Sequence, residues 1–106
     1  MEPIIVLITA LNEDECAKIG RALVEENLAA CANIIKGVRS IYRWRGDVFD
    51  EGECMMVVKT VRANFGRLEK RVRGLHSYEL PEIIALPIVK GFEPYLRWVE
   101  ENTRLG

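Results

Sequence analysis

The sequence is poor in the residues that build metal and redox centres. Its 106 residues include one histidine and three cysteines. Cys16, Cys31 and Cys54 show no CxxC spacing, the pattern typical of zinc ribbons and dithiol redox sites. An odd number of cysteines also argues against a disulfide framework, so we expect reduced thiols.

Motifs of common enzyme chemistry are absent from the sequence as well. The chain has no glycine-rich phosphate loop, no GxSxG, no HExxH and no EF-hand loop. Catalysis would therefore have to rest on an isolated nucleophile, for which Lys59 and Cys31 are the candidates. We expect no enzymatic activity, and one thiol or amine with unusually fast alkylation would contradict that expectation.

Long apolar runs and excess charge of one sign are also missing. The apolar run over residues 4–10 is far too short to cross a bilayer, which needs about 20 residues. The start Met1-Glu2-Pro3 lacks the basic segment of a secretory signal. A net charge of -1 and a pI of about 5.9 give no electrostatic footprint for nucleic acid or an anionic membrane. We therefore expect a cytoplasmic protein that binds neither.

What the chain does contain is the composition of one globular domain, over residues 1–106. Hydrophobic residues make up 49% of the sequence and charged residues 29%. The hydrophobic spacing predicts alternating strands and helices. Strands are expected over residues 4–8, 29–35, 38–45, 54–60 and 83–89, and helices over about 12–27, about 63–75 and from about 94 onward.

Four local signals indicate where these elements meet. Asn12 is expected to cap the first helix, with Glu15 three residues later as in a capping box. Lys36-Gly37 is expected to break the chain between two strands, and Gly46-Asp47 to turn it into a long hairpin. Pro87 cannot donate to a strand ladder, so the last strand should be an edge or carry a bulge there.

This order predicts an α+β fold of the ferredoxin-like kind, βαββαβ, with a long hairpin and a C-terminal helix. The continuously apolar residues 4–8 indicate a central strand covered on both faces. Two helices would cover one face. The C-terminal helix, with Trp98, Val99 and either Leu96 or Tyr95 on its buried side, is too short to cover the other. We therefore expect other subunits to supply that cover.

The candidate functional residues each allow two interpretations. His76 follows the second helix, where it could be a cation favoured by the helix dipole or a metal ligand. Cys31 could be a small buried hydrophobe or a soft ligand suited to Cu(I). Tyr42 and Trp44 alternate on one strand face, typical of packing at a subunit contact or of a pocket wall. Two further residues, Lys59 and Glu82, could be surface groups, or together an interface ion pair or a polar pair in a cleft.

Four segments, in the same order and spacing, resemble the CutA family of divalent-cation tolerance proteins. They are Ala29-Ala30-Cys31-Ala32-Asn33-Ile34, Val38-Arg39-Ser40-Ile41-Tyr42-Arg43-Trp44-Arg45-Gly46, Val58-Lys59-Thr60 and His76-Ser77-Tyr78-Glu79-Leu80-Pro81-Glu82-Ile83-Ile84. The likeness covers almost the whole chain. It implies a ferredoxin-like fold, a cytoplasmic homotrimer joined through the long hairpins, and a role in copper tolerance with binding of Cu(II). It also implies an architecture similar to that of the trimeric PII signalling proteins.

The resemblance also implies roles for particular residues. His76 and Cys31 match possible metal ligands. The positions that match the lining of an inter-subunit cleft are Tyr42, Trp44, Lys59, Tyr78 and Glu82. The chain departs from the family pattern at Ser77, where a proline is usual, and at Arg43 and Arg45, where an aromatic and an acidic residue are more common. The leading hypothesis is a trimer that binds a divalent metal, most readily copper. The alternative is a PII-like signalling or scaffold trimer that binds a small ligand or a partner protein in its clefts.

Overall fold

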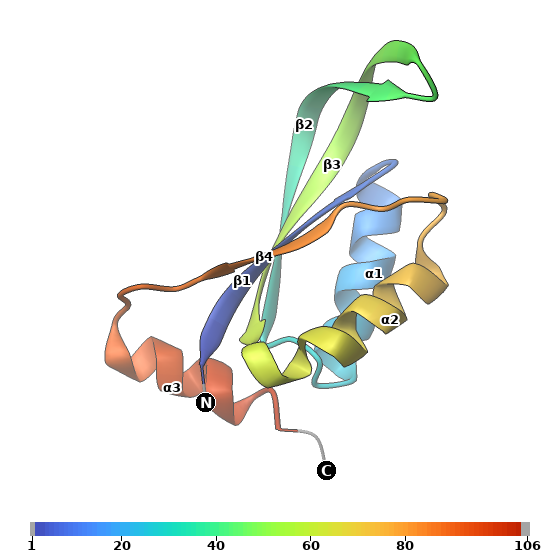
Figure 1. Cartoon of the computed structure of the whole chain (residues 1–106). Coiled ribbons are helices and arrows are strands. Elements are labelled where there is room, and N and C mark those ends of the chain that lie inside the picture. Colours follow the sequence, from blue (N-terminus) through green and yellow to red (C-terminus); the bar gives the residue numbers. More distant parts are fainter. Residues whose placement is uncertain (1, 105–106) are drawn as a thin grey trace.

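The structure, a computed structural model, describes residues 2–104 (Figure 1). It consists of a four-stranded sheet and three α-helices, with a short 3-10 turn at Arg62–Asn64 before the second helix. The elements are β1 (Pro3–Ala10), α1 (Glu13–Glu25), β2 (Cys31–Trp44), β3 (Asp47–Val61), α2 (Phe65–Leu75), β4 (Ile83–Pro87) and α3 (Glu93–Glu101). This confirms the predicted βαββαβ order with a C-terminal helix and the ferredoxin-like fold.

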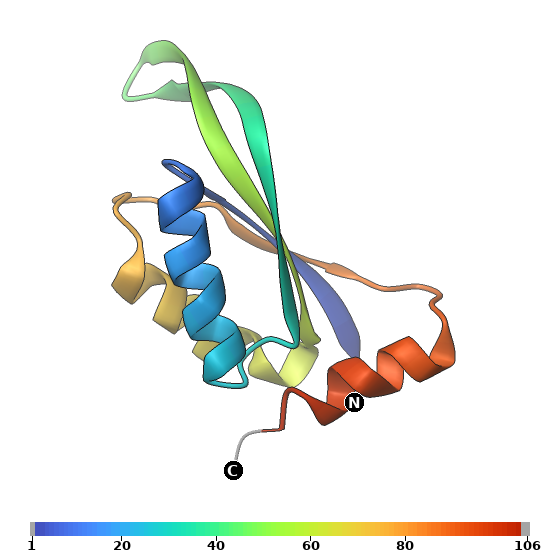
Figure 2. The same ribbon diagram turned by 180° about the vertical axis from the view of Figure 1, so that it is seen from behind.

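The sheet has the strand order β2-β3-β1-β4, and every neighbouring pair is antiparallel. Side chains alternate across a strand, so one face carries the even-numbered residues of β1 and β3. These residues are buried under α1 and α2, which lie side by side on that face (Figure 2). The core between the two layers includes Ile4, Val6, Ile8, Met56 and Val58 of the sheet and Ile19, Leu23, Leu68 and Val72 of the helices.

The second face of the sheet is covered at one end only. There α3 packs through Val99 against Val61 and Ala30, on the side of the sheet away from α1 and α2 (Figures 1 and 2). Beyond α3 this face is apolar and accessible. Ile35, Ile84 and Leu86 keep 46%, 49% and 48% of their surface exposed. We call this surface the open face. A single chain therefore does not cover both faces of the central strand β1, as the sequence led us to expect.

The first helix begins as its sequence predicts. The side chain of Asn12 accepts a hydrogen bond of 2.9 Å from the backbone N–H of Glu15. In the usual capping box the Glu15 carboxylate would accept from the cap residue, but here it accepts from the N–H of Leu11 at 3.0 Å. Glu15 therefore holds the connection between β1 and α1 as well as the helix start.

The predicted break at Lys36-Gly37 is wrong, because β2 runs without interruption from Cys31 to Trp44. The pairing shifts there: Ile35 lies opposite Met55, whereas Val38 lies opposite Glu53. Two residues of β2 thus oppose one of β3, which is a β-bulge, and Gly37 accommodates it with a φ of 76°. A bulge reverses which residues face which side, so Tyr42 and Trp44 share the open face with Cys31.

The hairpin closes with Arg45 and Gly46 between the paired residues Trp44 and Asp47. Both turn residues have positive φ, 51° and 88°. A two-residue turn of this kind matches the right-handed twist of the strands, and it fixes their register.

The buried side of α3 is narrower than the sequence suggests. Val99 is fully buried, whereas Tyr95 and Trp98 are 40% and 42% exposed in the single chain. Their rings lie 5.5 Å apart. The last strand ends at Pro87 and not at residue 89, and it is an edge strand, as the proline predicted.

Candidate functional site

The seven residues singled out from the sequence fall into three places. Four of them line one cavity of about 570 Å³ between the hairpin and the segment after α2: Tyr42, Trp44, Tyr78 and Glu82. Cys31 and Lys59 lie opposite each other at the far end of the open face. His76 lies in the interior, where its side chain has no exposed surface.

Aromatic side chains form one wall of the cavity. Tyr42 and Trp44 project from alternate positions of β2, and Tyr78 comes from the segment between α2 and β4. The Tyr42 ring also stacks on Phe49 across the hairpin, with ring centres 5.5 Å apart. The cross-strand pairing thus holds the wall in place, and the cavity is of a size that small ligands occupy.

Carboxylates form much of the cavity's polar surface. Glu53 of β3, Glu79 and Glu82 all line it, together with the guanidinium of Arg43. Three acidic groups against one basic group give the cavity a negative formal charge. The Arg43 guanidinium donates to the Gly46 carbonyl at 3.1 Å, so its charge is held at the turn.

Both tyrosine hydroxyls act as hydrogen-bond donors in the cavity. Tyr78 donates to the Glu53 carboxylate at 2.7 Å, and Tyr42 donates to the Glu51 carboxylate. The hydrogen bond to Glu51 raises the pKa of Tyr42 to about 12. Burial, followed by the hydrogen bond to Glu53, raises the pKa of Tyr78 well above its usual value. Both phenols therefore stay protonated at neutral pH.

Arg45 joins the hairpin tip to the other side of the cavity. Its guanidinium carbon lies 5.2 Å from the centre of the Trp44 ring, within the range of a cation–π contact. The same guanidinium donates to the Glu79 carboxylate at 2.8 Å. Both partners of this ion pair are about 70% exposed, so it stabilises the fold by no more than about 1 kcal/mol.

His76 uses both ring nitrogens within the chain. Its Nδ1 atom accepts a hydrogen bond of 3.1 Å from the backbone N–H of Tyr78. Nε2 therefore carries the hydrogen, which it donates to the carbonyl oxygen of Thr9 at 2.7 Å. A Glu15 carboxylate oxygen lies 4.0 Å from Nδ1. Both ring nitrogens are thus engaged inside the chain, and metal binding would require this segment to move.

Cys31 and Lys59 belong to a different cluster. The Lys59 ammonium donates to the side-chain oxygen of Asn33, and the Cys31 sulfur lies 3.7 Å from the same oxygen. The Cys31 thiol also lies near Tyr95 of α3, and burial, followed by this thiol, raises the pKa of Tyr95. Within one chain Lys59 therefore neither lines this cavity nor pairs with Glu82, and its expected place in an inter-subunit cleft stays a prediction. Lys59 lies opposite Ile5 of β1, whereas Thr9, which lines the cavity, lies opposite Met55. These two positions of β1 are four residues apart, which is about 13 Å along a strand.

A single chain does not assemble the predicted metal site. His76 and Cys31 lie in separate clusters, and within residues 2–104 no group of three or more histidine, cysteine or acidic side chains could hold a metal ion. Cys16 and Cys54 are buried packing residues, as expected, and burial and the neighbouring Cys54 raise the pKa of Cys16 to about 12. The donors present in one chain therefore do not fit a copper centre.

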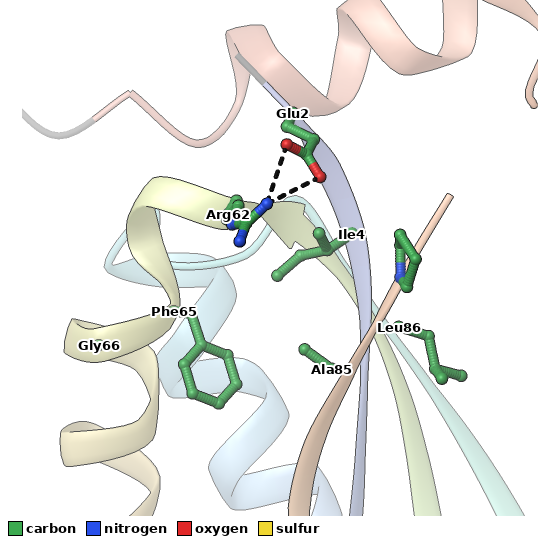
Figure 3. A pocket seen from close by; sticks show the side chains of 8 residues that line it. Glu2, Ile4, Arg62, Phe65, Gly66, Ala85 and Leu86 are labelled. Atoms are coloured by element: carbon green, nitrogen blue, oxygen red, sulfur yellow. Dashed lines mark hydrogen bonds and ion pairs between the residues drawn. The ribbon is translucent and has the colours of Figure 1, made fainter. Parts of the chain in front are cut away.

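A second cavity of about 570 Å³ lies at the start of β1, away from the predicted residues. Ile4 and Ala85 line it with the ring of Phe65, and Arg62 closes it through an ion pair of 3.4 Å with Glu2 (Figure 3). None of the seven predicted residues lines it. The first cavity therefore remains the candidate functional site.

The sequence reading missed Glu53, Glu79 and Arg45. A usable signal existed for Glu53, because a two-residue turn at Arg45-Gly46 fixes the hairpin register. Counting back from that turn places Glu53 opposite Val38, on the same face as Tyr42. Glu79 carries no such signal, because the segment between α2 and β4 has no regular pairing.

The fold and cavity define the chain as a small ferredoxin-like domain with an aromatic and acidic pocket. The chain matches the family described as CutA1 divalent ion tolerance protein over residues 4–102, and it belongs to that family. It is 50% identical over 99 residues to the divalent-cation tolerance protein CutA of Thermus thermophilus, which covers 93% of this chain and 96% of that protein. Mouse protein CutA is 43% identical over 96 residues, and this chain spans about half, 54%, of its length.

Solved structures agree with this assignment. The structure of the divalent cation tolerance protein from Thermus thermophilus superposes with a TM-score of 0.94 at 49% identity, covering 96% of this chain and 99% of that one. A protein from Nostoc sp. PCC 7120 described as the PII-like protein CutA in apo form has a TM-score of 0.88 at 34% identity, covering 97% and 99%. Among the described residues, no helix has the length and apolar character needed to cross a membrane.

Proposed function

We propose that the chain acts as a cytoplasmic homotrimer that binds a small ligand in the cavity lined by Tyr42, Trp44, Tyr78 and Glu82, in the manner of a PII-like protein. The observation that carries this proposal is the convergence itself. Four residues from two segments more than thirty positions apart line one cavity of about 570 Å³. The role is binding and not catalysis, in keeping with a family described by ion tolerance and not by a reaction.

The open face supports the trimer. Ile35, Ile84 and Leu86 are each close to half exposed on a sheet face that α3 covers only at one end. Several large apolar side chains exposed on one sheet face are typical of surfaces that lie between subunits. Tyr95 and Trp98 of α3 add further exposed aromatic surface. We propose that neighbouring copies of the chain cover this surface.

Two measurements test the proposal. Native mass spectrometry should show three chains per particle. A thermal-shift screen of metabolites should find a compound that stabilises the wild-type protein, because a ligand that binds only the native state stabilises it. The same compound should have a smaller effect on Tyr78→Phe, which lacks the hydroxyl that donates to Glu53. A monomer, or a protein that no compound stabilises, would refute the proposal.

Copper binding is the second candidate, and it depends on Cys31. This thiol is the one cysteine of the three that reaches solvent, and the family is described by divalent ion tolerance. A trimer would supply three copies of Cys31, and Cu(I), the softer of the two copper ions, favours thiolate ligands. We expect stoichiometric copper binding to be lost in Cys31→Ser and kept in His76→Gln. Copper binding that survives in both variants would show that the metal is held only by non-specific groups on the surface.

A further inference from the structure

We infer that the cavity selects an organic cation that carries a guanidinium or similar planar charged group. This inference rests on the proposed function, since it names the class of ligand for the same cavity. Its basis is the way in which the chain places its own guanidinium, that of Arg45, at the edge of the cavity.

The first step is the chemistry of the walls. Aromatic faces attract cations through their negative quadrupole, and carboxylates attract them through charge. The cavity combines Tyr42, Trp44 and Tyr78 with Glu53, Glu79 and Glu82. The Arg43 guanidinium, the opposing charge in the lining, is directed to the Gly46 carbonyl. An anionic ligand such as a nucleotide would meet repulsion here, whereas a cation would not.

The second step is the state of the individual carboxylates. Glu53 accepts from Tyr78 at 2.7 Å, and Glu79 accepts from Arg45 at 2.8 Å. Within residues 2–104, no hydrogen bond or ion pair engages the carboxylate of Glu82, although it lines the same cavity. The cavity therefore offers the unpaired carboxylate of Glu82 and the carboxylate of Glu79, which is held only by the exposed ion pair with Arg45.

The third step is the position of Arg45. Its guanidinium lies over Trp44 at 5.2 Å and bonds to Glu79, so it makes the two contacts that a guanidinium ligand would make. Arg45 sits at the hairpin turn with a positive φ of 51°, a conformation that arginine rarely adopts. Its side chain is 70% exposed and can leave at little cost. We therefore regard Arg45 as an internal competitor for the ligand's position.

The test compares two small probes of nearly the same shape. n-Butylguanidinium carries the planar charge, and n-butylurea replaces it with a neutral group. Titrations followed by the NMR signal of the Trp44 indole N–H suit the millimolar affinities of such small molecules. We expect saturable binding of the guanidinium to the native trimer and none of the urea.

Four variants locate the site and test the competition. Glu82→Gln should weaken binding of n-butylguanidinium about 3- to 10-fold, and so should Trp44→Leu, whose titration is followed by calorimetry because this variant lacks the indole signal. Glu101→Gln, at the exposed end of α3, is the matched control for charge and should change nothing. Arg45→Asn removes the internal cation while asparagine tolerates the positive φ, and it should strengthen binding about 3-fold or more. A structural role for Arg45 alone predicts the opposite change or none.

The outcomes separate this inference from the proposed function. If neither the wild type nor Arg45→Asn binds n-butylguanidinium, but a neutral or anionic compound shifts the Trp44 signal saturably, the cation inference is wrong and the cavity remains the binding site. If no compound of any charge affects the cavity residues, both proposals are wrong. Equal binding of the guanidinium and the urea would also overturn the inference, because charge would then play no part.

Discussion

The Nε2 atom of His76 lies 2.7 Å from the carbonyl oxygen of Thr9, so the imidazole fastens the end of α2 to the end of β1. The same ring accepts the backbone N–H of Tyr78 at 3.1 Å. The segment that carries Tyr78, Glu79 and Glu82 to the cavity therefore begins at a fixed point. His76 acts on the site by positioning its neighbours and does not itself line the cavity.

Replacing His76 with alanine should lower the free energy of unfolding by about 2–4 kcal/mol. The change leaves the Thr9 carbonyl and the Tyr78 N–H without partners in a buried place, and each such group costs about 1–3 kcal/mol. Urea denaturation at one fixed chain concentration measures the effect, since assembly contributes to stability. His76→Gln, whose amide can still donate to Thr9, should recover part of the loss. An alanine variant as stable as the wild type would show that the ring is not needed here.

Glu15 should make stability depend on pH in the acid range. Burial raises its pKa, but hydrogen bonds from Leu11 and Ser77 outweigh this, and the net pKa is lowered from 4.5. A group whose pKa falls on folding stabilises the native state when ionised. Its contribution is therefore complete well above pH 4.5 and is lost as the pH falls through the lower, folded pKa.

The check compares unfolding free energies between pH 6 and pH 3 for Glu15→Gln and the wild type. The variant should be less stable at pH 6 and should lose less stability on acidification, since it cannot bind the proton. Asp14→Asn, an exposed first-turn residue of the same helix, is the control and should follow the wild-type slope. Identical slopes in all three proteins would contradict the assignment.

The three cysteines should differ in their reaction with iodoacetamide. Cys16 and Cys54 are buried, so the reagent does not reach them, and the raised pKa of Cys16 also keeps its thiol protonated. Cys31 reaches solvent. Mass spectrometry of the native protein should therefore find at most one modified site, Cys31, and three after unfolding in guanidinium chloride. Modification of Cys16 at the same rate as Cys31 would show that the core opens readily.

Much of the fold follows from local sequence signals. Asn12 caps α1 because its side chain accepts from an N–H three residues ahead, which depends on neighbours in sequence alone. The βαββαβ order follows from hydrophobic spacing in the same way. The expected break at Gly37 failed because a glycine with positive φ suits a bulge as well as a turn. Only the pairing with β3 decides between them.

The site was harder to predict, because it depends on register across the sheet. Tyr42 and Trp44 were recognised from strict alternation. The family resemblance places Lys59 in the same inter-subunit cleft, whereas in the single chain it lies opposite Cys31 at the other end of the open face. The register between two paired strands cannot be deduced from the sequence of either strand alone. The same limit applies to His76, whose contact with Thr9 joins residues 67 positions apart.

An acidic residue at Ile84 should break the assembly. Ile84 is 49% exposed on the open face, so aspartate costs the isolated chain little but would bury an unpaired charge between subunits. Native mass spectrometry should show monomers for Ile84→Asp. Val24→Asp, on the exposed side of α1, is the control and should remain trimeric. Trp44→Ala should also weaken the trimer on dilution. A trimer that tolerates Ile84→Asp would place the subunit interface elsewhere.

The hairpin turn allows a test in which backbone conformation is the single variable. Gly46 has a φ of 88°, and a Cβ atom added there would meet nothing within 4 Å. Gly46→Ala therefore introduces no clash, and its cost is that of a left-handed alanine, about 1 kcal/mol. Gly52 of β3 offers equally open space, but its φ lies outside the left-handed region.

Gly52→Ala is for that reason the matched control, and it should leave stability unchanged or raise it slightly, because alanine restricts the unfolded chain. Urea denaturation of the two variants at one chain concentration measures the difference. Because the turn fixes the register that sets Tyr42, Trp44 and Glu53 around the cavity, Gly46→Ala should also broaden the NMR signal of the Trp44 indole. Equal stability of the two variants would mean that the turn does not hold this register and that contacts further down the hairpin do.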